Sequence, residues 1–187
     1  IVHDGAPIVV SAPGLGLGSL AAESIDDRVV VTERSMANHH LAVQWDLDGS
    51  IVSIIDVVRG REVLPTGRAI SVDLAPDHPV EYDAWDVESW TIEQSQPVGG
   101  VTSVSLVHDS PLLARLEVSR AFGGSTMTTT YVLRAGSARL DIEFDIDWNE
   151  REQLLSLMVP IDVRASEAVC GIQFGNVRRP THPSSPW

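Results

Sequence analysis

Hydrophobic and polar residues alternate strictly between Leu140 and Trp148. The apolar positions are Leu140, Ile142, Phe144, Ile146 and Trp148, and carboxylates fill the positions between them. Because successive side chains of a β-strand point to opposite faces, this pattern predicts a strand with one apolar and one acidic face. Burial of five large apolar side chains is worth on the order of 10 kcal/mol before entropy is subtracted, so the face needs a covering layer. We therefore predict that this segment is a central strand of a β-sandwich.

Other short apolar runs, separated by Gly, Pro and Asp-Gly turn signals, supply further strands. They lie at residues 28–33, 41–47, 51–58, 69–74, 101–107, 114–122, 125–133, 154–159, 161–163 and 169–174. The dipeptide Asp48-Gly49 predicts a tight hairpin turn in which both residues have positive φ. Residues 175–183 are predicted to form a loop, and few or no helices are expected. Strands of this length and spacing indicate an all-β fold, an antiparallel β-sandwich.

Composition excludes several classes of function. The 187-residue chain has a formal net charge of −13, and all 13 of its basic residues are arginines. This balance argues against binding to nucleic acid or to an anionic membrane, since both need a cationic surface. No apolar run approaches the roughly 20 residues of a membrane span. A single cysteine, Cys170, cannot form an internal disulfide, which fits a reducing compartment, and we expect a cytoplasmic location.

The acidic positions of the Leu140 segment are one candidate for chemistry. Asp141, Glu143, Asp145 and Asp147 would lie about 6.5–7 Å from their neighbours on one face, a separation compatible with glycosidase carboxyl pairs. A catalytic acid also needs a pKa that burial or a neighbouring charge has raised. Carboxylates that alternate with core residues usually form the solvated face of a half-buried sheet. We therefore favour a solvated face over an acid–base site.

Two adjacent histidines have the residue type of a metal site. His39 and His40 are followed by Asp46 and Asp48, and together they could be drawn as zinc ligands. Adjacent residues of a strand point to opposite faces, however, so both imidazoles do not readily reach one ion. We predict structural or surface roles for these histidines.

Two segments carry residue types suited to sugar recognition, because aromatic faces stack on pyranose rings while carboxylates and arginines bond hydroxyl groups. The first contains Tyr82, Asp83, Trp85, Asp86 and Trp90; the second contains Arg178, Arg179, Thr181 and His182. Equally, the tryptophans could be buried between sheets and the second segment could be a loop ordered by Arg–Asp pairs. The first segment supports an alternative functional hypothesis, an independent carbohydrate-binding module that uses Tyr82, Trp85 and Trp90.

Four passages occur in order along the chain. They are Asn38-His39-His40-Leu41 with residues 48–56 and 60–64, Asp83-Ala84-Trp85-Asp86, residues 146–150 with Leu154-Leu155, and residues 172–175 with Arg179-Pro180-Thr181-His182. Over about residues 38–182, this series resembles the β-rich region of glycoside hydrolase family 38 α-mannosidases.

The resemblance implies a longer enzyme with an α/β barrel, a three-helix bundle and C-terminal β domains of the galactose-mutarotase-like supersandwich type. It implies retaining hydrolysis of α-mannosides by an aspartate nucleophile and a Zn²⁺ ion. In the family these groups lie in and around the barrel, and no position of this chain matches them. Residues 1–34 are then expected to be the end of a preceding small β unit with a linker, and residues 35–187 a large β-sandwich domain truncated at its C-terminus.

On this basis we expect a part that is non-catalytic in isolation, packs on the barrel of the same polypeptide and lends loops to the cleft rim. The substrates would be mannoside glycans, in mannose metabolism. The candidate rim or domain-contact residues are Asp83, Trp85, Asp86, Arg179, Thr181 and His182. A sandwich separated from its barrel exposes a formerly covered patch, so we also expect a homo-oligomer.

Overall fold

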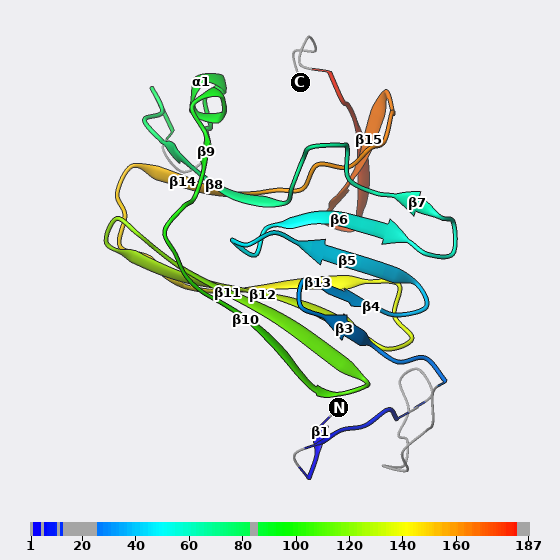
Figure 1. The fold of residues 1–187 in the computed structure, drawn as a ribbon. Helices are drawn as coiled ribbons and strands as arrows, with labels where there is room; N and C mark the ends of the chain where they lie inside the picture. The colour runs from blue at the N-terminus through cyan, green and yellow to red at the C-terminus, as the bar shows by residue number, and fades with distance from the viewer. Residues whose placement is uncertain (1, 5, 11, 13–25, 83–85, 183–187) are drawn as a thin grey trace.

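Antiparallel strands make up almost all of the regular structure (Figure 1). The computed structural model describes residues 2–4, 6–10, 12, 26–82 and 86–182. In this part of the chain, α1 (Ser89–Glu93) is the one α-helix. No helix among the described residues is long and apolar enough to cross a membrane. The prediction of an all-β, antiparallel sandwich with few helices is confirmed.

Two sheets form the sandwich. The first contains, in order, β3 (Val30–Thr32), β4 (Ser35–Ala37), β5 (Leu41–Trp45), β6 (Ile51–Asp56) and β7 (Arg61–Glu62). The second contains β10 (Val101–Ser110), β11 (Leu113–Phe122), β12 (Ser125–Arg134) and β13 (Leu140–Asp147). Buried and less buried positions alternate along most of β11 and along β12 up to Tyr131, because the side-chain period of a strand is two residues.

The hydrophobic core lies between these two sheets. Met36, Val43 and Ile51 of the first sheet form one buried cluster with Leu116 and Tyr131 of the second. Gly49, at the tip of the β5–β6 connection, has a φ of 73°, and a Cβ there would lie 2.5 Å from the Val118 side chain. The connection therefore packs against the opposite sheet at a point where only glycine fits.

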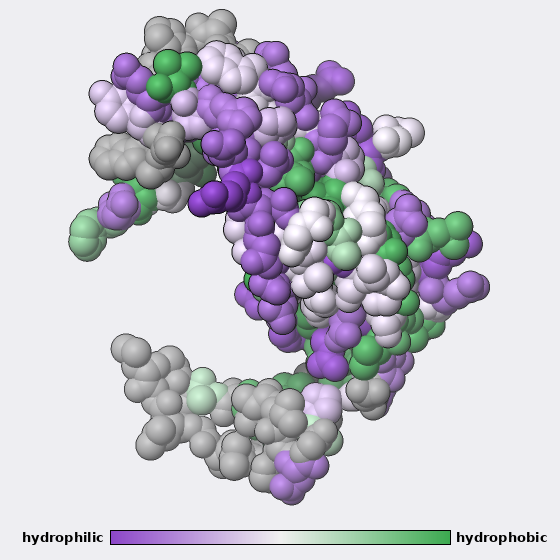
Figure 2. All heavy atoms as spheres, turned by 90° about the vertical axis from the view of Figure 1, so that its left-hand side faces the viewer, coloured by the Kyte–Doolittle hydropathy of each residue, from purple (hydrophilic) through white to green (hydrophobic). Residues whose placement is uncertain are grey.

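Smaller sheets extend the layer that contains β5 and β6. β14 (Gln153–Met158), β8 (Ser71–Pro76) and β9 (Gln96–Pro97) form a three-stranded sheet, and the Ile70 N–H donates to the Ile51 carbonyl at 2.9 Å, linking it to β6. β15 (Glu167–Ile172) and β16 (Gly175–Pro180) form a hairpin, and β1 (Val2–His3) pairs with β2 (Ala6–Pro7). Hydrophilic and intermediate side chains make up most of the upper part of the molecule in Figure 2, at the height where α1 lies in Figure 1.

The prediction that the Leu140 segment is a central strand is wrong. β13 is at the end of the order β10–β11–β12–β13, and among the described strands it pairs with β12 alone. The alternation itself is confirmed, since Ile142 packs against the core cluster. Farther along the same face, Phe144 is 39% and Ile146 38% exposed. A hydrophobic pattern determines which face is apolar, but the number of neighbouring strands depends on distant segments.

Three local predictions also need correction. Residues 175–180 are not a loop, because they form β16 and pair with β15 from Ile172↔Gly175 to Glu167↔Pro180. In the β5–β6 connection only Gly49 has a positive φ, so Asp48-Gly49 is not the predicted tight turn. Instead the Asp46 carboxylate accepts the backbone N–H groups of Asp48 and Ser50 and organises a longer turn. The β5–β6 hairpin itself is confirmed.

The predicted boundary between residues 34 and 35 remains a prediction. Hydrogen bonds cross it; for example, β3 pairs with β4, and the Asp27 carboxylate accepts the His39 N–H.

Candidate functional site

Both described rings of the first candidate segment, Tyr82 and Trp90, are exposed. Tyr82 has a φ of 58° and an exposed ring, and its carbonyl accepts the Asp86 N–H at 3.1 Å. Trp90 lies in α1 and is 43% exposed, so its ring is not buried between the sheets. Asp83 and Trp85 lie outside the described residues. The described part of this segment therefore presents two accessible rings and one carboxyl group.

The second segment belongs to the β15–β16 hairpin. Arg178 Nη1 lies 3.3 Å from Glu167 Oε2 across the two strands, and Arg179 is exposed. Thr181 closes the base of the hairpin, since its hydroxyl donates to the Ala165 carbonyl at 2.5 Å and its N–H to the Ser166 carbonyl at 3.1 Å. His182 follows directly. Residues 163–168 and Thr181 line an open hollow of about 860 Å³.

The described parts of these two segments lie on separate elements. In Figure 1, α1 and the β15–β16 hairpin are separate projections beside the layer of β8 and β14. Both lie at the end of the molecule opposite the N-terminus (Figure 1). The arrangement suits two separate contacts with a larger surface better than a single closed binding site.

The acidic face of β13 is open to water. Glu143, Asp145 and Asp147 are exposed, and Asp141 is paired with Arg134 and with Arg139, whose Nε lies 2.6 Å from Asp141 Oδ1. Neither burial nor a closed pocket surrounds these groups among the described residues, so the face lacks the desolvated setting that a catalytic acid needs. The interpretation as a solvated sheet face is supported.

A second hollow, of about 330 Å³, also contains titratable groups. Asp77, His78, Pro79 and Glu152 line it, and His78 Nδ1 lies 3.6 Å from Glu152 Oε2. Within the described ranges, no group of three or more His, Cys, Asp or Glu side chains could hold a metal ion. A zinc ion therefore finds no ligand set among the described residues.

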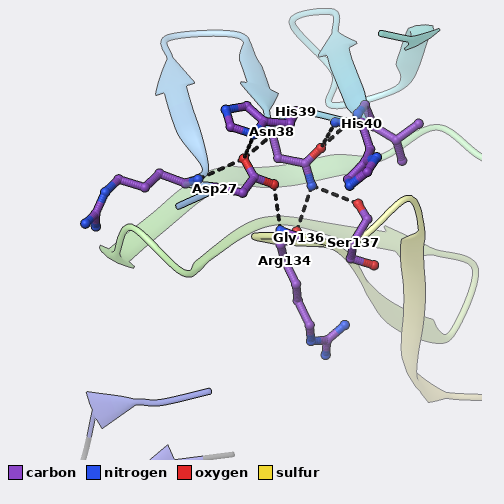
Figure 3. A network of polar contacts seen from close by, with 9 residues as sticks. Asp27, Asn38, His39, His40, Arg134, Gly136 and Ser137 are labelled. Atoms are coloured by element: carbon purple, nitrogen blue, oxygen red, sulfur yellow. Dashed lines mark hydrogen bonds and ion pairs between the residues drawn. The ribbon is translucent and has the colours of Figure 1, made fainter. Parts of the chain in front are cut away.

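The most developed polar cluster joins the β3–β4 side of the sandwich to the β12–β13 connection (Figure 3). The buried Asp27 carboxylate accepts the backbone N–H groups of Arg28 at 2.8 Å, His39 at 3.0 Å and Gly136 at 2.6 Å. Burial raises the pKa of Asp27, but these hydrogen bonds and the nearby His39 imidazole outweigh it, so the pKa lies below its usual value. His39 Nδ1 lies 3.5 Å from Asp27 Oδ1, and this contact supports a structural role for the histidine.

Asn38 completes this cluster with four hydrogen bonds. Its Nδ2 donates to the carbonyls of Arg134 at 2.7 Å and Ser137 at 2.8 Å, and its Oδ1 accepts the N–H groups of His40 and Leu41, both at 2.8 Å. The side chain is buried, so every one of these bonds replaces water at a backbone group. The cluster holds two segments about one hundred residues apart in fixed register.

Two glutamates of the ordered passages have comparable roles. Glu62 Oε1 accepts the N–H groups of Ile54, Val63 and Leu64, and Glu62 Oε2 accepts the Ser53 hydroxyl. Partial burial raises the pKa of Glu62, and these bonds lower it by more. Glu150 Oε1 accepts the Gly124 N–H at 2.7 Å and the Ser125 hydroxyl at 2.8 Å, which fixes the β11–β12 turn.

Sequence reasoning missed these roles. Asn38, Glu62 and Glu150 were recognised only as parts of passages, and Asp27 was not singled out. Most of their partners are backbone groups, which no residue pattern marks. Asp27 meets Gly136 across more than a hundred residues, so only the folded topology reveals that contact.

Comparison with known proteins gives a consistent family. The family described as "Glycosyl hydrolases family 38 C-terminal domain" matches residues 36–187. Human alpha-mannosidase 2C1 is 30% identical over 82% of this chain, and Dictyostelium discoideum alpha-mannosidase G is 29% identical over 80%. The Saccharomyces cerevisiae alpha-mannosidase is 25% identical over 73%. The chain spans only 13–15% of the length of these relatives.

Proposed function

We propose that this chain, which belongs to glycoside hydrolase family 38, is the non-catalytic β-sandwich part of a longer, retaining, zinc-dependent α-mannosidase. The family match over residues 36–187 is the observation that carries this proposal. The chain packs on the catalytic barrel of the same polypeptide, which hydrolyses mannoside glycans in the cytoplasm. Named α-mannosidases among its relatives support the reaction class.

The Zn²⁺ ion of the proposed enzyme is held by residues outside this chain. The described residues offer no group of three or more ligands for it. What these residues contribute is a rigid sandwich, in which Asp27, Asn38 and Glu150 hold the connections between strands. A rigid scaffold positions its projecting loops with little conformational freedom, which is what a cleft rim requires.

The projecting segments are the proposed rim and domain contacts. They include Asp86, Arg179, Thr181 and His182. We propose the same rim or domain-contact role for Asp83 and Trp85. Asp86 follows exposed Tyr82 in one projection, and exposed Arg179 lies on the other. An arginine on a rim can donate paired hydrogen bonds to vicinal hydroxyl groups or to a carboxylate of the barrel.

Two assays test the proposal. The 187-residue chain should not hydrolyse an aryl α-mannoside with or without added Zn²⁺, and turnover that Asp145→Asn abolishes would overturn its non-catalytic assignment. In the longer enzyme, Arg179→Ala should lower kcat/KM about three- to ten-fold. Arg68→Ala, an exposed arginine between β7 and β8, is the control and should leave kcat/KM unchanged. Equal kcat/KM values for the two variants would contradict a rim position for Arg179.

A carbohydrate-binding module is the second candidate, favoured by the exposure of Tyr82 and Trp90. Here the isolated chain would bind mannose or mannobiose through these rings and Trp85. Titration of tryptophan fluorescence up to tens of millimolar sugar should then show quenching that Trp90→Ala reduces. Fluorescence that does not change with sugar concentration would contradict this candidate, and the scaffold function would be the one that remains.

We also propose that the isolated chain self-associates, because several large apolar side chains of the C-terminal hairpin are exposed.

A further inference from the structure

Among the described strands, β13 has a neighbour on one edge only, and part of its apolar face is exposed. Its edge opposite β12 pairs with no described strand. Phe144, Ile146 and Trp148 are each 38–39% exposed, whereas Thr129 and Met127, which pair with Phe144 and Ile146 on β12, are at most 2% exposed. The exposure of this face is therefore a property of the edge strand alone.

The edge of β13 has few of the devices that usually prevent strand addition. The β12–β13 register runs without a bulge from Leu133↔Leu140 to Thr126↔Asp147, and no proline interrupts it. By contrast, the other edge strand, β10, has register shifts between Val101 and Ser103 and between Val107 and Ser110. Edge strands of stable proteins are usually bulged, short or charged on the inward face. β13 is long and regular, and its inward side chains are apolar.

The outward side chains specify the charge of a partner. Glu143, Asp145 and Asp147 are exposed in a row on the face opposite the apolar side chains. A strand added to β13 would place every second side chain beside these carboxylates, and opposite charges across two strands are stabilising. The remaining side chains would extend the apolar face beside Phe144 and Ile146.

We propose that β13 is an acceptor for an additional strand in which apolar residues alternate with arginine or lysine. The part of the longer polypeptide outside these 187 residues supplies this strand. The relatives are about seven times longer than the matched region, so most of such a protein lies outside the match. This inference goes beyond the proposed mannosidase function and rests on it only in that the chain is part of a longer protein.

Two other occupants, β13 of a second copy and strand β16, fit less well. Antiparallel pairing of β13 with β13 of a second copy would bring two rows of carboxylates together, and like charges directly opposite are destabilising. In β16, Arg178 and Arg179 are adjacent and so point to opposite faces, which does not match a single acidic row. A basic–apolar strand from elsewhere satisfies both faces at once.

A synthetic peptide tests the acceptor directly. The probe is about nine residues of alternating valine and arginine with blocked ends, roughly the length of β13. Added to the 187-residue chain, it should slow hydrogen–deuterium exchange of the backbone amides in residues 140–147. A peptide of the same composition with the valines and arginines in two blocks, and one with alternate backbone nitrogens methylated, should each bind at least about ten-fold more weakly.

Matched variants of the chain separate this site from general attraction to an acidic protein. Glu143→Gln with Asp145→Asn should weaken binding several-fold, while Glu93→Gln with Asp162→Asn, on other elements, should not. Equal binding of the block or methylated peptide, or an equal effect of the two double variants, would overturn the proposal. Protection of residues 140–147 without peptide that increases with protein concentration would identify a second copy as the occupant and overturn it equally.

Discussion

At the scale of single residues, the recognisable passages of this chain mostly satisfy backbone groups. Asn38, Glu62 and Glu150 each bind N–H or C=O groups of connections that no strand partner reaches. An unpaired backbone group in a buried position costs free energy comparable to a lost hydrogen bond. Such residues are therefore restricted in type by the fold, even though they perform no chemistry.

Replacement of Asn38 should show how much the fold depends on this bonding. Asn38→Ala leaves two carbonyls and two N–H groups without their partner, and we expect a loss of about 2–4 kcal/mol in the free energy of unfolding. Asn176→Ala, an exposed asparagine on β16, is the control and should change stability by less than about 0.5 kcal/mol. Urea unfolding measures both, and similar losses in the two variants would contradict a special role for Asn38.

Asp27 should make stability depend on acid pH. Its pKa is lower in the folded protein than the usual value of 3.8, so its contribution is complete above that value and is lost as pH falls through the lower, folded pKa. Asp27→Asn should be less stable near pH 7 but should lose less stability between about pH 5 and pH 2. Asp145→Asn, at an exposed position, is the control.

Unfolding midpoints in urea across this pH range measure the effect of Asp27. The difference between wild type and Asp27→Asn should narrow as pH falls. A difference that stays constant with pH would show that the variant loses packing rather than a charge-dependent interaction.

At the scale of elements, the sequence predicted strands and faces better than it predicted neighbours. The inward positions of β11 and β12 and the alternation of β13 follow from the period of two. The position of β13 at an edge could not be read from its own residues, because an apolar face looks the same beside one strand or two. β16 was missed because Gly175 and Pro180 resemble loop signals, although they only bound the strand.

Glycines illustrate how an element depends on contacts beyond its own backbone angles. Gly60, with a φ of 61°, has open space where a Cβ would lie, whereas at Gly100, with a φ of 69°, a Cβ would collide with the backbone carbonyl oxygen of Ala121. Gly60→Ala should therefore lose only the left-handed backbone preference, about 1 kcal/mol.

Gly100→Ala should lose at least about 3 kcal/mol, because the Ala121 carbonyl cannot move without disturbing the start of β10 and the end of β11. The same urea measurement compares the two variants at matched φ. If both lost the same amount, the collision would be relieved by a shift of the chain, and the close approach of Gly100 to β11 would not be rigid.

At the scale of the whole molecule, the candidate site was only partly accessible to sequence reasoning. The family passages identified the projecting segments, and the structure shows Tyr82, Trp90 and Arg179 to be exposed. In the proposed longer enzyme, the groups that these side chains meet would depend on residues outside this chain. The net charge of −13 and the exposed apolar side chains of the C-terminal hairpin describe the isolated chain, and they act in opposite directions on its association.

The balance of these two forces gives a test of self-association. Val169, Ile172 and Phe174 are exposed on the two-stranded β15–β16 hairpin, and a two-stranded hairpin is marginally stable in water unless another surface covers it. Repulsion between acidic copies opposes that contact, and it weakens as the screening length falls from about 30 Å at 0.01 M salt to about 3 Å at 1 M. In sedimentation velocity, the mean sedimentation coefficient should therefore rise with protein concentration, and more steeply at high salt.

The choice of variant identifies the surface responsible. Ile172→Ser with Phe174→Ser should remove most of the concentration dependence, because both side chains lie at the hairpin tip. Leu47→Ser with Val58→Ser removes two exposed apolar side chains from turns of the five-stranded sheet and should leave association unchanged. Since both pairs lower surface hydrophobicity, a selective loss assigns the contact to the hairpin, whereas equal losses would indicate unspecific association. A coefficient independent of concentration at high salt would show that −13 charges and a small hairpin suffice to keep the chain monomeric.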